Sequence, residues 1–196
     1  SKLKNIVSLG LTYSSMETSG IEIDINWGSS QAEQIPAQYI VFLQPTYERL
    51  VLKGRLGLRV APVMVGVNRK AIGSGIGGRF YFTRQKPFNF ALGADIAFVN
   101  STLYRQFSIA STHRDSINNY PGYNQVKKEN KNELYITPIV VQFSYTLKSN
   151  NYFSADLSLG GRQILSNKTF TYDGRPYQYD RFPSYGQLRL NIGKKF

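Results

Sequence analysis

The chain of 196 residues contains no cysteine and a single histidine, His113. Without cysteine it can form neither a disulfide nor a thiolate metal site. One histidine without cysteine also provides too few ligands for a transition-metal site. We therefore expect no bound metal and no cofactor. The sequence begins at Ser1 without a signal peptide, and we expect a mature or trimmed chain.

Long hydrophobic runs are also missing. Hydrophobic residues make up 41% of the chain, and no stretch approaches the ~18 apolar residues that a membrane-spanning helix needs. A membrane-spanning β-barrel avoids this requirement, because only alternate residues of each strand face lipid. The 14 tyrosines and 12 phenylalanines are enough for aromatic girdles at two interfaces. The alternative is a soluble all-β sandwich or a lipocalin-like barrel, which also uses aromatic residues.

The final stretch, residues 186–196, shows the alternation most clearly. Four apolar side chains share one face of a strand: Leu188, Leu190, Ile192 and Phe196. The stretch resembles the C-terminal insertion signal of bacterial outer-membrane barrels, which ends in Phe after alternating apolar residues. It departs from that signal at Lys194, where an aromatic or apolar residue is usual. The resemblance implies recognition by the barrel assembly machinery, with Phe196 at the periplasmic rim.

Most of the chain repeats this period of two. Nine segments are strand candidates: 4–14, 20–28, 38–50, 55–66, 76–84, 88–98, 133–147, 151–163 and 186–196. Segments of about ten alternating residues separated by turns are typical of transmembrane β-barrels, whose strand number is even in single-chain bacterial proteins. We predict one domain, residues 1–196, folded as a closed antiparallel up-and-down barrel of eight strands, with ten as the fallback. Either 20–28 or 4–14 is then not a barrel strand, or one strand is undetected.

Alternation assigns each strand residue to the lipid or to the lumen. It places Met64 and Tyr135 on the lipid face, and it places Leu157 and Asp156 on opposite faces. The polar side chains expected in the lumen are Arg59, Arg79, Asp95, Gln142, Asp156 and Arg162.

The turn lengths set Arg79 diagonal to Asp95, and Gln142 opposite Asp156, within reach of each other. Because an eight-stranded barrel is just wide enough to be filled by side chains, we expect a plugged polar network and no open pore.

The connections alternate between short and long. The long ones are expected at residues 29–37, 67–75, 101–131 and 164–181. Outer-membrane barrels have short periplasmic turns and long extracellular loops. We therefore predict that these four connections face the cell exterior and carry whatever function the barrel has.

Two strands resemble those of a known family. Residues 41–47 read Val-Phe-Leu-Gln-Pro-Thr-Tyr, and residues 134–141 form an apolar strand with an internal proline. Both resemble strands of the small PorT-like outer-membrane barrels of Bacteroidota. The resemblance implies an eight-stranded outer-membrane barrel, and no single activity.

Catalytic chemistry has little support. Ser111, His113 and Asp115 are close in sequence, but catalytic triads are assembled by geometry from separate elements, and a solvated loop histidine is the simpler interpretation. The net charge of +12 is scattered over turns and strand ends. We expect these positive charges to attract anionic lipid headgroups, including lipopolysaccharide. We expect no nucleic-acid binding.

We expect a non-enzymatic outer-membrane barrel that serves as a structural or accessory subunit. It would act through its extracellular loops, or within a larger envelope complex for secretion, assembly or uptake. A small solute channel and an outer-membrane lipid-modifying enzyme are the alternatives.

Overall fold

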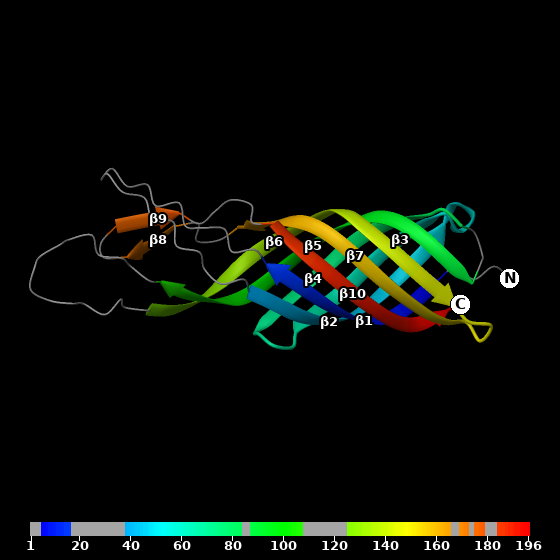
Figure 1. Ribbon diagram of the computed structural model, residues 1–196, viewed down its shortest axis with the longest axis horizontal. Helices are drawn as coiled ribbons and strands as arrows, with labels where there is room; N and C mark the ends of the chain where they lie inside the picture. Colours follow the sequence, from blue (N-terminus) through cyan, green and yellow to red (C-terminus); the bar gives the residue numbers. More distant parts are fainter. Residues whose placement is uncertain are drawn as a thin grey trace, which may run out of the picture.

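The protein is a closed antiparallel β-barrel. A computed structural model describes residues 5–16, 38–83, 87–107, 125–165, 169–172, 175–178 and 184–196. Eight strands form the barrel in the order β1-β10-β7-β6-β5-β4-β3-β2 (Figure 1). They are β1 (Asn5–Met16), β2 (Gln38–Val51), β3 (Leu56–Gly66), β4 (Ala71–Tyr81), β5 (Phe88–Phe107), β6 (Gln125–Thr146), β7 (Asn151–Ile164) and β10 (Ser184–Lys195). The predicted eight-stranded barrel is thereby confirmed.

Two short strands stand apart from the barrel wall. β8 (Thr169–Tyr172) and β9 (Arg175–Gln178) pair only with each other, in a two-stranded sheet. They fall inside the stretch that the sequence predicts to be a polar loop. The predicted strand 20–28 lies outside the described residues, whereas the strand at 4–14 is β1. Within the described part of the chain, no helix is long and apolar enough to cross a membrane.

The barrel has two unlike ends. At one end, which we call the short-turn end, β2 is joined to β3 through the 3-10 turn η1 (Leu52–Gly54), and residues 147–150 join β6 to β7. The first described residue, Asn5, and the C-terminal residue Phe196 lie at this end (Figure 1). At the other end β5 and β6 remain paired as far as Phe107 and Gln125. The predicted loop over 101–131 is therefore wrong in part, because both strands continue well into that range. The predicted loop over 67–75 is also wrong in part, because β4 begins at Ala71.

Pro62 of β3 and Pro138 of β6 each lie in a β-bulge that distorts the barrel wall. Residues 62 and 63 of β3 lie opposite the single residue 74, and residues 138 and 139 of β6 lie opposite the single residue 94. Proline has no N–H to donate to a sheet ladder, so it is found where a bulge interrupts the ladder. Each bulge reverses the alternation beyond it. Met64 and Tyr135 are therefore buried in the lumen, and their predicted position on the lipid face is wrong.

The outer surface of the barrel is apolar on every strand. Outward-facing Val, Leu, Ile and aromatic side chains on all eight strands are 40% exposed or more, including Leu11, Leu157 and Leu190. Outward-facing aromatic rings gather near the short-turn end, where the Phe82, Phe90 and Phe143 rings follow one another at centroid distances of 5.3 Å. This apolar outer surface is the kind of wall that a hydrocarbon environment requires.

The lumen is filled in layers. Near the short-turn end, Ile6, Leu50, Tyr81, Ala91 and Tyr152 form one buried cluster. Toward the other end lies a second, larger cluster, which includes Met64 and Tyr135. Its members are Ile40, Phe42, Ala61, Met64, Ala71, Val99, Tyr135 and Tyr185. Charged side chains occupy the level between the two clusters.

Candidate functional site

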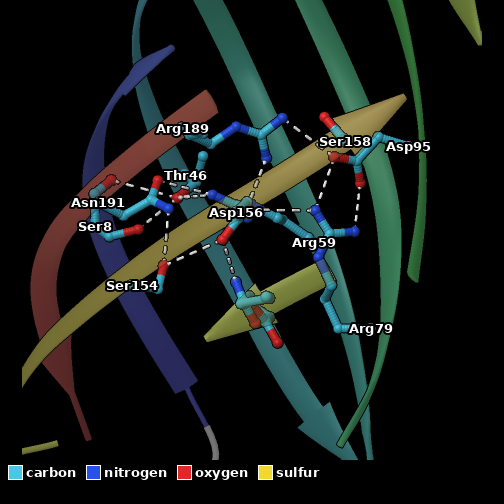
Figure 2. A network of polar contacts seen from close by, with 12 residues as sticks. Ser8, Thr46, Arg59, Arg79, Asp95, Ser154, Asp156, Ser158, Arg189 and Asn191 are labelled. Carbon is cyan, nitrogen blue, oxygen red and sulfur yellow. Dashed lines mark hydrogen bonds and ion pairs between the residues drawn. The ribbon is translucent and has the colours of Figure 1, made fainter. Parts of the chain in front are cut away.

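Asp156 is the hub of the charged layer. Its Oδ2 atom lies 2.9 Å from Arg59 Nη1 and 3.4 Å from Arg189 Nη1, and its Oδ1 accepts a hydrogen bond of 2.9 Å from Gln142 Nε2 (Figure 2). Gln142 and Arg189 stand directly opposite Asp156 on the two neighbouring strands. Arg79 lies slightly farther away, at 3.6 Å. The Asp156 side chain is 1% exposed, so protein groups provide its solvation.

Asp95 is the second acceptor of the layer. Arg79 binds it through both terminal guanidinium nitrogens, with Nη1 2.6 Å from Oδ1 and Nη2 2.7 Å from Oδ2. Bidentate pairs of this kind are the strongest arginine–carboxylate pairs. Arg189 Nη2 donates to Asp95 Oδ2 at 3.1 Å, and this oxygen also accepts the hydrogen bond from Arg79 Nη2. Arg79 lies diagonal to Asp95 across the β4–β5 pair, as the turn length predicted. Arg189 therefore links the two aspartates.

The charges in this layer balance. Arg59, Arg79 and Arg189 carry three positive charges, whereas Asp95 and Asp156 carry two negative charges. Glu48 supplies the third carboxylate, since it lies opposite Arg59 and accepts a hydrogen bond of 2.6 Å from Tyr81 Oη. A buried cation without a partner is very costly, and each of the three arginines lies within 3.4 Å of an Asp95 or Asp156 oxygen.

The network draws on every strand of the barrel. Arg59 donates to Thr46 of β2 at 3.4 Å, and Arg189 Nε donates to Thr12 of β1 at 3.3 Å. We call the following set the central network: Thr12, Thr46, Glu48, Arg59, Arg79, Asp95, Gln142, Asp156, Arg189 and Asn191. Because each strand contributes at least one residue, the network fixes all eight strands relative to one another.

Glycine makes room for the arginine–aspartate pair. A Cβ atom on Gly77 would lie 1.8 Å from Asp95 Oδ1, and one on Gly93 would lie 2.7 Å from Arg79 Cδ. Both glycines face the lumen directly opposite these two charged residues. The missing side chains are therefore what lets the pair lie flat against the wall.

Arg162 belongs to a different cluster. Its Nη1 atom lies 3.0 Å from Glu133 Oε1, and the other oxygen of Glu133 accepts hydrogen bonds from Ser101 at 2.9 Å and Tyr135 at 3.3 Å. This group lies beyond the apolar cluster of Tyr135, away from the short-turn end. The predicted lumen set thus divides in two, with Arg162 apart from the other five residues.

Little space remains in the lumen at the level of the central network. A cavity of about 30 Å³ lies among Arg59, Asp95 and Arg189 and the apolar cluster beside them, which is room for a water molecule or two. Thr137 and Tyr185 join their hydroxyl groups by a hydrogen bond just above it. Between its two apolar clusters, the lumen is packed rather than open.

Sequence reasoning missed several members of the central network. Arg189 lies between Leu188 and Leu190, and Glu48 alternates with the outward residues Leu43, Pro45 and Tyr47 that precede it. Both signals place the charged residue in the lumen. Arg189 is not in the predicted lumen set, although it lies on the polar face of residues 186–196. Leu188, Leu190, Ile192 and Phe196 all lie on the outer surface and are 41–58% exposed.

The described residues contain no group of three or more His, Cys, Asp or Glu side chains that could hold a metal ion. His113, Ser111 and Asp115 lie outside the described residues.

Comparisons with known proteins reveal similarity of fold only. No family model matches the chain, and no match is found among curated proteins. The structure of Neisserial surface protein A aligns with a TM-score of 0.53 and 12% identity, over 98% of this chain and 97% of that one. The N-terminal β-barrel domain of Pseudomonas aeruginosa OprF aligns with a TM-score of 0.46 and 10% identity, over 98% and 99%. Ail of Yersinia pestis aligns with 0.41 and 11%, over 100% of both chains.

Proposed function

The chain has the fold of small eight-stranded outer-membrane barrels, and we propose that it is a non-enzymatic protein of the bacterial outer membrane. In this role it is a structural or accessory subunit that acts through its longer connections, or within a larger complex for secretion, assembly or uptake. The observation that carries this proposal is the central network. A lumen closed by balanced charges and two apolar clusters leaves the outer wall and the strand ends as the surfaces available for function.

The orientation follows the general rule for such barrels. Short turns face the periplasm and longer connections face the exterior, so the short-turn end, with Asn5 and Phe196, is periplasmic in this proposal. Lipopolysaccharide would surround the opposite end, where Arg69 and Lys70 lie between β3 and β4. Their charges suit the phosphate groups of such lipids. We propose no nucleic-acid partner.

The membrane assignment and the plugged lumen can be tested together. The refolded chain should stay soluble only in detergent, and the unheated barrel should migrate differently from the heated chain on gels. In planar bilayers it should give no steady conductance. A stable open channel would contradict the structural role and support the solute-channel alternative. Purification from native membranes in mild detergent would then identify the envelope proteins that accompany it.

Lipid-modifying activity is the remaining alternative, and it has its own test. If the protein is not an enzyme, mass spectrometry of envelope lipids should show no change when it is expressed. A modified lipid that disappears in the His113→Ala variant would overturn the non-enzymatic assignment.

We further propose that the alternating C-terminal strand is the signal by which the barrel assembly machinery recognises the chain. Deletion of Phe196 should then reduce the amount inserted severalfold in cells, while the stability of barrels that do insert changes little. Deletion of the exposed Leu52 in the β2–β3 turn provides a control, because it shortens the chain equally without touching this strand. Normal insertion of the Phe196 deletion would contradict the signal.

The affiliation with PorT-like barrels of Bacteroidota also stays a proposal. Its support is the pair of resembling stretches in β2 and β6, each with an internal proline, Pro45 and Pro138. An alignment of that family with this chain should place its prolines at both positions. An alignment that fits neither position would remove the affiliation without affecting the fold.

A further inference from the structure

The short-turn end of the barrel holds a cavity of about 220 Å³. It lies next to the inner apolar cluster, and the buried rings of Tyr81 and Tyr152 form part of its wall. Tyr81 Oη is hydrogen-bonded to Glu48 and Gln142. The cavity therefore ends at the central network and opens only toward the short-turn end.

Unpaired hydroxyl groups gather in the wall of this cavity. Five buried side-chain polar atoms in the described residues lack a hydrogen-bond partner, and three of them belong to residues lining it: Ser144 Oγ, Thr146 Oγ1 and Tyr152 Oη. Buried polar groups are normally paired, so a cluster of exceptions needs an explanation. Each of these oxygens is fully buried in the wall, so its side chain has to rotate before the hydroxyl group can donate a hydrogen bond to an acceptor bound in the cavity.

The electrostatic field at the cavity favours an anion. Two of its lining residues, Lys53 and Lys195, are cationic, and none is a carboxylate. Arg49 also lines the cavity, but its guanidinium donates to Asn5 Oδ1 on the exposed surface. Lys148 and Lys194 are exposed nearby at the same end of the barrel. Glu48 lies behind the Tyr81 hydroxyl and already accepts its hydrogen bond. Clefts lined by one sign of charge concentrate ligands of the opposite sign.

The remaining wall is apolar. Ile6 and Leu50 are buried members of the inner cluster, and Leu52 projects from the turn. In this turn Leu52 and Lys53 have φ angles of 47° and 58°, in the left-handed region that residues other than glycine seldom adopt. Strained backbone of this kind is concentrated at ligand sites, and both residues line the cavity.

We propose that this cavity binds a small organic anion with an apolar body, of the class of aromatic or short-chain carboxylates. The carboxylate would lie toward Lys195 and the unpaired hydroxyl groups, and the apolar body would lie against Ile6 and Leu50. The cavity is smaller than the 300–1,000 Å³ of sites for drug-sized ligands, which limits the ligand to a few carbon atoms or a single ring. This site is independent of the envelope partners proposed above.

The test uses 4-fluorobenzoate as the probe. Fluorine NMR of the probe, titrated with refolded full-length protein in zwitterionic micelles, should show saturable binding beyond that of empty micelles. The neutral 4-fluorobenzyl alcohol should bind at least tenfold more weakly. Lys195→Gln should weaken binding of the carboxylate about tenfold.

Lys194→Gln is the matched control. Lys194 is the adjacent residue with the same charge, but it is not among the residues that line the cavity, so its replacement should leave the affinity within twofold of the parent. Heat-dependent gel migration verifies that each variant forms a barrel. Absence of saturable binding, equal loss in both variants, or equally tight binding of the alcohol would each overturn the proposal.

Discussion

Asp156 and Leu157 are consecutive residues of β7, yet they lie in opposite environments. Asp156 is 1% exposed and surrounded by arginine side chains, whereas Leu157 is 53% exposed on the outer wall. In a soluble barrel the apolar side chains fill the interior and polar side chains cover the outside. Here the arrangement is reversed at the level of the central network. The wall is therefore apolar on its outer face, as contact with lipid requires, while polar side chains in the lumen solvate the buried charges.

Removal of the hub charge should give the largest effect. Asp156→Asn keeps the shape but leaves three arginines facing two carboxylates. Breaking a buried ion pair costs about 3–5 kcal/mol, and we expect a loss of that order in the free energy of unfolding, measured by urea titration in micelles. Ser158→Ala is the control, because Ser158 shares this face and donates only a hydrogen bond of 3.5 Å to Gln187. A loss for Asp156→Asn no larger than for the control would refute the hub role.

A charge on the outer face should cost slightly less. Leu157→Arg places a guanidinium on the lipid side, which costs about 2–4 kcal/mol near the bilayer midplane and about 0–1 kcal/mol near the interface. Leu147→Arg, at the turn between β6 and β7, is therefore the matched control, and it should be nearly neutral in the same titration. Equal effects at the two positions would mean that the wall is not in contact with a hydrocarbon layer.

The smallest expected difference in stability is between alanine substitutions at two adjacent glycines. Gly77→Ala adds a methyl group 1.8 Å from Asp95 Oδ1, whereas the nearest atom to such a group on Gly78 is 3.9 Å away. Overpacking typically costs about 1–3 kcal/mol, so Gly77→Ala should destabilise the barrel by about that amount and Gly78→Ala should not. If thermal unfolding shows no difference between the two variants, the arginine–aspartate pair is not packed against the wall as described.

Much of this architecture is predictable because outward apolar residues alternate with inward residues along most of each strand. The alternation in β1, β5, β7 and β10 identifies strands, faces and closure, and the turn lengths alone bring Arg79 to Asp95. The rule fails beyond Pro62 and Pro138, where a bulge changes the parity. The prolines were visible in the sequence, but only pairing with both neighbouring strands shows where the extra residue lies.

The ends of β5 and β6 were missed for another reason. Residues 127–131 read Lys-Lys-Glu-Asn-Lys and show no alternation. Apolar and polar residues alternate only where the two faces of a strand lie in different environments. Backbone pairing alone continues the hairpin to Phe107 and Gln125. The partners of Arg59 and Asp156 could not be identified either, since parity places residues in the lumen but does not rank contacts across it.

The seam between β1 and β10 determines how such a barrel can form. Ile6 pairs with Lys195, and Asn5 and Phe196 exchange backbone hydrogen bonds of 2.8 and 2.9 Å. Every other barrel pair joins consecutive barrel strands, and only between β7 and β10 do other strands, β8 and β9, intervene along the chain. Loop-closure entropy grows as (3/2)RT ln n, so joining ends some 190 residues apart costs about 3 kcal/mol more than closing a four-residue turn. Closure of the seam should therefore be the last and slowest folding step, preceded by an open sheet with two unpaired edges that are prone to aggregation.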